Sequence, residues 1–202
     1  MNFLISIILT IVIISIGRNF IKTHSKLCYI LSAIISIVLI IASYSGVLSN
    51  VSPFVKAHIL PIFTKSAFAT SLFVVVMYTG ALKNGSKLMK ILMPIRAELS
   101  IIASILTLAH NIIFGKYHFV TLFTDPKSMS LNMLLAAIIS VVLIAIMLPL
   151  MITSFTSIRK KMKHKSWKKI QRLAYVFYGL IYLHIMLIMV PVAKTGNAQY
   201  IL

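Results

Sequence analysis

Long apolar runs separated by short gaps are the feature of this sequence that most constrains its fold. The runs cover residues 2–17, 27–48, 62–82, 95–117, 131–155 and 170–190. A helix that crosses a bilayer needs roughly 20 mostly apolar residues, and only the first run is clearly shorter. Because 60% of the residues are hydrophobic and 11% are charged, little polar surface remains for a water-soluble domain. The sequence therefore predicts an all-α integral membrane protein, a bundle of six transmembrane helices.

The gaps between the runs alternate in charge. Three, four and eight basic residues lie in the gaps 18–26, 83–96 and 159–172, which together hold 15 of the 20 Lys and Arg residues. Basic residues mark the cytoplasmic side of a membrane protein, so these three gaps are predicted to be cytoplasmic and both termini extracytoplasmic. The first run is followed rather than preceded by basic residues. Residues 1–26 therefore read as an uncleaved anchor helix with a basic loop, separate from residues 27–202.

The charge balance and the single cysteine narrow the classes of function. The formal net charge is +18, and Glu98 and Asp125 are the two acidic residues of the chain. Since the basic residues flank apolar runs, we expect them to contact the anionic lipids of the bilayer and not nucleic acid. Cys28 has no partner for an intrachain disulfide, and hydrolysis by paired carboxylates is excluded. The predicted location is the cell membrane, a bacterial cytoplasmic membrane, as a multi-pass protein.

Two histidines lie deep within predicted spans. His110 follows Arg96 by 14 residues, and His184 follows Ile170 by the same number. At about 1.5 Å per residue each imidazole would lie roughly 21 Å above the cytoplasmic edge, in the outer half of the bilayer. Two imidazoles at one height suit the axial positions of a b-type haem. Two independent histidines, each hydrogen-bonded to a neighbouring helix, remain an alternative, and a Zn²⁺ site would need further ligands.

The predicted cytoplasmic ends of the fourth and sixth spans carry Arg96, Glu98, Trp167, Gln171 and Arg172. In one interpretation Glu98 pairs with a neighbouring arginine, and Trp167 anchors its helix at the interface. In the other, a flavin or quinone docks here, with the arginines holding its oxygens and Trp167 stacking on its ring. The sequence leaves both interpretations open.

Four stretches carry a resemblance to a known family. They are TGAL at 79–82, IRAELSIIASILTLAH at 95–110, LPLMITSFTS at 148–157 and SWKKIQRLAYVFYGLIYLH at 166–184. In their order and spacing these stretches resemble the ferric reductase-like transmembrane domain. They most resemble its small bacterial branch, which contains the haem-binding membrane subunit of the methionine sulfoxide reductase system. The resemblance implies that residues 27–202 form a haem-binding transmembrane bundle.

The resemblance also implies particular ligands. By position, His110 and His184 match haem-ligand positions of the family. The remaining ligand position, four residues after Trp167, is occupied by Gln171, which is a poor ligand for haem iron. We therefore expect one haem b, in the outer half of the membrane. Lys65, His58 and Lys116 are candidate partners for its propionates at the outer edge.

Three functions follow as alternatives. The first is electron transfer from a quinol or flavin donor towards an extracytoplasmic acceptor, as one subunit of an oxidoreductase system with a separate reductase or acceptor subunit. The second is haem sequestration or sensing without turnover. The third is a small transporter, which would need interrupted helices near mid-membrane, and the sequence offers only Pro149 for that role.

Overall fold

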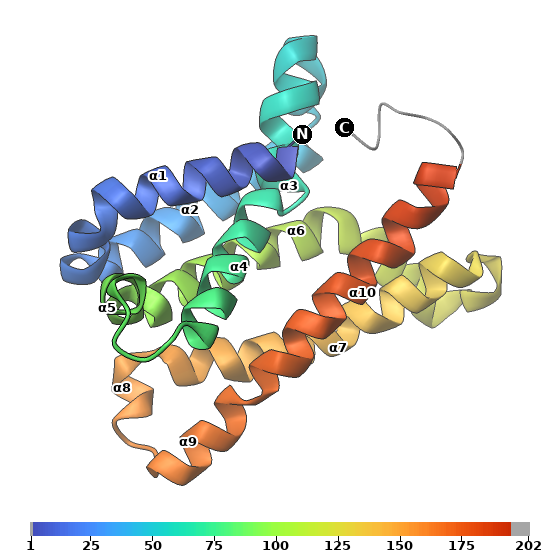
Figure 1. Cartoon of the computed structure of the whole chain (residues 1–202). Helices are drawn as coiled ribbons and strands as arrows, with labels where there is room; N and C mark the ends of the chain where they lie inside the picture. The colour runs from blue at the N-terminus through green and yellow to red at the C-terminus, as the bar shows by residue number, and fades with distance from the viewer. Residues whose placement is uncertain (1, 195–202) are drawn as a thin grey trace. The chain divides into compact units, whose positions relative to one another are not determined.

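The computed structural model of the chain describes residues 2–194, and all the regular structure in that range is helical (Figure 1). Five helices are long and apolar enough to cross a membrane. A sixth span results if the bent pair Val55–Thr64 and Ala67–Ala81 counts as one. The prediction of an all-helical multi-pass membrane protein is confirmed. The chain ends, residues 1 and 195–202, lie outside the described residues, so the extracytoplasmic position of both termini stays a prediction.

The chain forms two compact units, residues 2–113 and the residues from 114 onward. The first unit contains α1 (Asn2–Thr23), α2 (Ser25–Tyr44), η1 (Val47–Asn50), η2 (Val55–Ile59, a π-helix), α3 (Leu60–Thr64), α4 (Ala67–Ala81), α5 (Lys87–Leu92), η3 (Met93–Ile95) and most of α6 (Arg96–Thr124). α1 extends beyond the predicted run of residues 2–17. Its last turns carry Arg18 and Lys22, whose long side chains can reach the polar edge of a membrane while the backbone stays helical.

The helix α1 has the polarity pattern of a membrane helix and not of a soluble one. Its buried side includes Ser6 and Thr10, whereas Leu4 and Ile8 on other sides are 65% and 62% exposed. Small polar residues allow close helix approach in lipid, and apolar side chains face the acyl chains. α1 packs against α4 and lies beside α2 (Figure 1).

Two hydrogen bonds join α2 to α6. The hydroxyl of Ser36 donates to the carbonyl of Ile105 at 3.3 Å, and the hydroxyl of Tyr44 donates to the carbonyl of Ile112 at 2.8 Å. Polar side chains within apolar helices are costly unless they find such partners, so these two bonds set which face of α2 meets α6.

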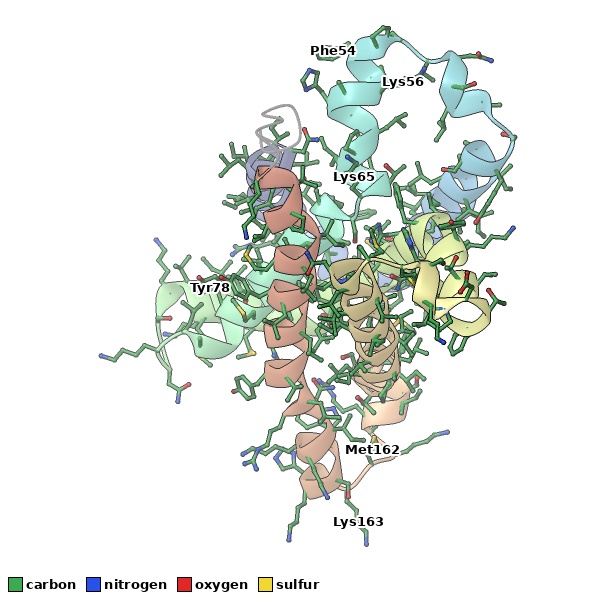
Figure 2. The ribbon with its side chains drawn as sticks, turned by 90° about the vertical axis from the view of Figure 1, so that its right-hand side faces the viewer. Phe54, Lys56, Lys65, Tyr78, Met162 and Lys163 are labelled. Atoms are coloured by element: carbon green, nitrogen blue, oxygen red, sulfur yellow. The ribbon has the colours of Figure 1, made fainter. Side chains whose placement is uncertain are left out.

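The third predicted span, residues 62–82, is interrupted where the sequence suggests a continuous helix. α3 ends at Thr64 and α4 begins at Ala67. The helical segments Val55–Thr64 and Ala67–Ala81 meet at an angle of 45°. Ser66 at the break has φ +61°, in the left-handed region that L residues other than glycine seldom adopt. Figure 2 shows Phe54 and Lys65 at opposite ends of the segment Val55–Thr64.

The second unit is organised around a helical hairpin. It contains η4 (Pro126–Ser128), α7 (Leu131–Ser154), α8 (Thr156–Arg159), α9 (His164–Gln171) and α10 (Leu173–Lys194), and α7 and α10 run side by side (Figure 1). The hydroxyl of Ser130 caps α7 by accepting the Met133 N–H at 3.4 Å. The predicted sixth span, residues 170–190, lies within the candidate span His164–Lys194, in which α9 is followed by α10 from Leu173.

Candidate functional site: two histidines and a basic helix end

His110 lies on α6 and is anchored to the end of α3. Its Nδ1 lies 2.9 Å from the carbonyl oxygen of Thr64. Because a carbonyl oxygen can only accept, Nδ1 carries the proton in this contact. The neutral imidazole then has its lone pair on Nε2, the nitrogen that would bind a metal.

The break in the third span supplies this carbonyl. Since α3 ends at Thr64, the Thr64 carbonyl is among the last-turn groups for which a helix provides no internal partner. The hydroxyl of Ser66, at the break, lies 3.4 Å from the hydroxyl of Thr107, one turn before His110 on α6. The break is thus held against the part of α6 that carries His110.

His184 has a matching arrangement in the second unit. Its Nδ1 lies 3.2 Å from the Ala136 carbonyl and 3.2 Å from the Ser140 hydroxyl, both on α7. Ser140 donates its own proton to the Ala136 carbonyl at 2.8 Å, so its oxygen accepts from His184. The proton of His184 is therefore also on Nδ1, and the lone pair is on Nε2.

Both histidines thus fit the chemistry of an axial haem ligand. A ligating histidine usually donates its other N–H to a carbonyl, a carboxylate or water, which fixes the tautomer and the ring orientation. His110 and His184 belong to different compact units. His110 lies 14 residues after the first residue of α6, and His184 lies 11 residues after the first residue of α10. The equal depth of the two histidines and their shared ligand site stay predictions.

Arg96 fastens the start of α6 to α4. Its Nε donates to the Val76 carbonyl at 3.2 Å, and its guanidinium lies over Gly80, where a Cβ would be 3.4 Å from a guanidinium nitrogen. The glycine of the TGAL stretch thus lies in van der Waals reach of the arginine. Glu98 follows Arg96 by two residues, in the first turn of α6.

Trp167 and Gln171 meet at one residue of α7. The indole Nε1 of Trp167 donates to the Thr153 carbonyl at 3.0 Å, and the Gln171 amide donates to the Thr153 hydroxyl at 3.0 Å. Thr153 in turn donates to the Pro149 carbonyl at 2.7 Å. Because Pro149 has no N–H, the carbonyl of Ala145, four residues earlier, has no helical donor. Thr153 binds the Pro149 carbonyl and not this one. The exposed Arg172 occupies the break between α9 and α10.

The structure therefore brings Trp167, Gln171 and Arg172 together at one end of the second unit, and it places Arg96 in the first. Lys65, a candidate propionate partner, is exposed and directly follows Thr64, the residue that anchors His110. Sequence reasoning missed the carbonyls of Thr64 and Ala136, because backbone groups leave no mark in a sequence. A signal for Ser140 existed: it is a hydroxyl residue within an otherwise apolar run.

Comparisons with known proteins agree with the resemblance of the sequence. A family model described as "Ferric reductase like transmembrane component" matches residues 65–182, a stretch that includes His110 and ends two residues before His184. An uncharacterized protein of Treponema pallidum (strain Nichols) is 39% identical over 196 residues, which is 97% of this chain and 54% of that protein. The chain thus spans about half the length of this curated relative. No solved structure matches.

The comparisons do not reach the methionine sulfoxide reductase branch, so that closer resemblance stays a prediction. The family match itself covers more than half of the chain and contains three of the four stretches in full and most of the fourth. The protein belongs to the ferric reductase-like transmembrane family.

Proposed function

We propose that this protein is a membrane b-type cytochrome that holds one haem between His110 and His184 and passes electrons towards an extracytoplasmic acceptor. Membership of the ferric reductase-like family indicates a membrane electron-transfer component. The observation that carries the proposal is that both imidazoles have their proton on Nδ1 and their lone pair on Nε2. Each donates Nδ1–H to a neighbouring helix, through the Thr64 carbonyl in one case and Ala136 and Ser140 in the other.

Hydrogen bonds within the chain would orient the two histidine ligands. The hydrogen bond at Nδ1 fixes the direction in which each ring points and increases the basicity of Nε2. A bound haem would supply reversible one-electron chemistry at its iron, with a potential set by these axial ligands and their hydrogen bonds. Lys65, which follows Thr64 at the end of α3, offers a positive charge for a propionate.

One haem is proposed rather than two because of Gln171. In the ligand position of the family, this residue uses its amide N–H to bind the Thr153 hydroxyl. An amide is a poor ligand for haem iron, and this one also joins α9 to α7.

The donor is proposed to be a quinol or a flavin that approaches the end of the second unit carrying Trp167 and Arg172. The Thr153 carbonyl holds the indole nitrogen, so the orientation of Trp167 is fixed at this end. Arg172 is exposed and could hold an anionic or carbonyl oxygen. If the donor is a flavin, we expect a separate reductase subunit to carry it.

Haem sequestration or sensing without turnover is the second candidate. The feature that favours it is again Gln171, because a single haem does not provide a chain of redox steps across the membrane. Electron transfer requires reduction by a quinol or flavin donor and rapid reoxidation by an acceptor. Sequestration requires only reversible haem uptake.

The main test is a reduced-minus-oxidised absorption spectrum of the purified protein with pyridine haemochrome quantitation. We expect about one low-spin haem b per chain, as two axial imidazoles require. His110→Ala and His184→Ala should each abolish the low-spin spectrum. Gln171→Ala should leave it nearly unchanged, and so should His118→Ala, a control histidine on α6. Low-spin haem that survives both ligand substitutions would refute the ligand assignment.

A second measurement separates the two candidate functions. Haem-loaded protein is mixed in a stopped-flow instrument with a reduced quinone analogue or a reduced flavin, and then with an oxidant. Rapid reduction and reoxidation would support electron transfer. Haem that is bound stoichiometrically but is not reduced by either donor would support sequestration.

A further inference from the structure

An open hollow lies at the α8–α9 end of the second unit. Its volume is about 290 Å³, and its lining residues are Arg159, Met162, His164 and Trp167. The rings of His164 and Trp167 contact one another, with centroids 5.8 Å apart. Figure 2 shows Met162 with Lys163 at the turn between the two helices. The lining thus combines a guanidinium and an imidazole with a thioether and an indole.

The charge around this hollow has one sign. Residues 159–172 contain eight Lys and Arg residues and no acid. In α9 the lysines are exposed, whereas Trp167, Ile170 and Gln171 are half-buried. Their spacing of three and four residues places them on one face of the helix, so the basic residues surround a helix whose other face packs on the protein. An anion is the complementary ligand.

The hollow also lies at the level where two spanning helices end. α7 ends at Ser154, α10 begins at Leu173, and the Trp167 indole is bonded to the Thr153 carbonyl in the last turn of α7. Phospholipid phosphates lie at this level of a membrane, and the positive-inside prediction assigns this end to the cytoplasmic leaflet.

We propose that this hollow binds the phosphate headgroup of one anionic phospholipid. Arg159 supplies a fork of N–H donors that matches phosphate oxygens. Met162 and Trp167 provide apolar surface for the carbons next to the phosphate, a feature that a free phosphate ion would not need. The site includes neither of the proposed haem ligands, and it shares Trp167 with the proposed approach of the electron donor.

The test uses the whole chain in detergent, titrated with short-chain phosphatidylglycerol. Trp167 is the single tryptophan of the chain, so its fluorescence reports directly on the hollow. Phosphatidylcholine of the same chain length and inorganic phosphate serve as the other two ligands. Native mass spectrometry counts the bound lipids. Arg159→Gln is compared with Lys87→Gln, which removes one positive charge from another basic gap.

We expect a saturable change in Trp167 emission with phosphatidylglycerol and one retained lipid per chain. Phosphatidylcholine should produce no such change. Arg159→Gln should weaken binding about tenfold, which corresponds to about 1.4 kcal/mol, and Lys87→Gln should change it less than about twofold. Equal weakening in the two variants would show a diffuse attraction and overturn the site. An equal response to inorganic phosphate would show that the ligand is not a lipid.

Discussion

The side-chain oxygens of Thr10 and Ser71 lie 2.5 Å apart, in a hydrogen bond that joins α1 to α4 inside the first unit. Ser71 also contacts the carbonyls of Ser6 at 3.2 Å and Phe68 at 2.7 Å. Thr10, Ser71 and Ser6 are each 0% exposed. The first helix is thus packed into the unit through small polar residues. The division into residues 1–26 and 27–202 stays a prediction.

Thr10→Val should destabilise the protein, because valine keeps the shape of threonine but removes its hydroxyl. We expect a loss of about 1 kcal/mol in the free energy of unfolding, within the range of hydrogen bonds between membrane helices. The measurement is a denaturation curve in mixed micelles. In a double-mutant cycle with Ser71→Ala, the two losses should not add. Additive losses would show that the two hydroxyls are not coupled.

Ser66 gives a prediction about the backbone. Ser66 has φ +61°. In this left-handed region a residue with a Cβ has a steric cost of about 1 kcal/mol, which glycine does not have because it lacks a Cβ. Ser66→Gly should therefore be more stable than Ser66→Ala by about 1 kcal/mol. The two variants lose the same contact with Thr107, so that contact cancels in their difference. An alanine variant as stable as the glycine variant would contradict the left-handed conformation.

Ser140→Ala should loosen the proposed haem without removing a ligand. The His184 N–H would keep the Ala136 carbonyl and lose the Ser140 oxygen. Loss of such a supporting bond weakens affinity about tenfold or more, and the haem potential should become more positive because the imidazole is less basic. Haem titration and redox potentiometry measure both effects. Ser104→Ala, which removes a buried hydroxyl bonded to Ser100 within α6, is the control.

Trp167→Phe should make the basic segment easier to cleave. The substitution keeps an aromatic ring but removes the N–H that donates to Thr153, at a cost of about 1 kcal/mol. The locally open population, and with it the rate of trypsin cleavage within residues 159–172, should rise about fivefold. Cleavage within residues 83–90 of the same chain is the internal control. An equal rise in both segments would indicate general destabilisation and not loss of this contact.

Much of the helical fold follows from apolar length. The predicted fifth span, residues 131–155, agrees within one residue with α7, Leu131–Ser154. Ser130 caps the start of this helix, and its long uninterrupted apolar run predicts a membrane-spanning helix. The break in the third span was not predictable in this way. Ser66 takes the left-handed conformation without being glycine, so no residue type signals the turn.

The candidate site was predictable only in its side chains. His110 and His184 stand out because imidazoles are rare within apolar runs. Their partners are mainly backbone carbonyls, and the one at Thr64 depends on where α3 ends. The predicted last span, residues 170–190, lies within the apolar stretch His164–Lys194, in which the structure separates α9 from α10 at Arg172. The equal depth of His110 and His184 in the membrane stays a prediction.

The length of α6 has a consequence on the side of the membrane opposite its first residue. With 29 residues it is about 43 Å long, whereas a hydrocarbon core is about 30 Å thick. If Arg96 lies at one boundary, an upright helix leaves the acyl chains near Lys116, and roughly 13 Å of it stands in the headgroups and the water beyond. The chain beyond the acyl chains on that side therefore begins as helix and not as loop.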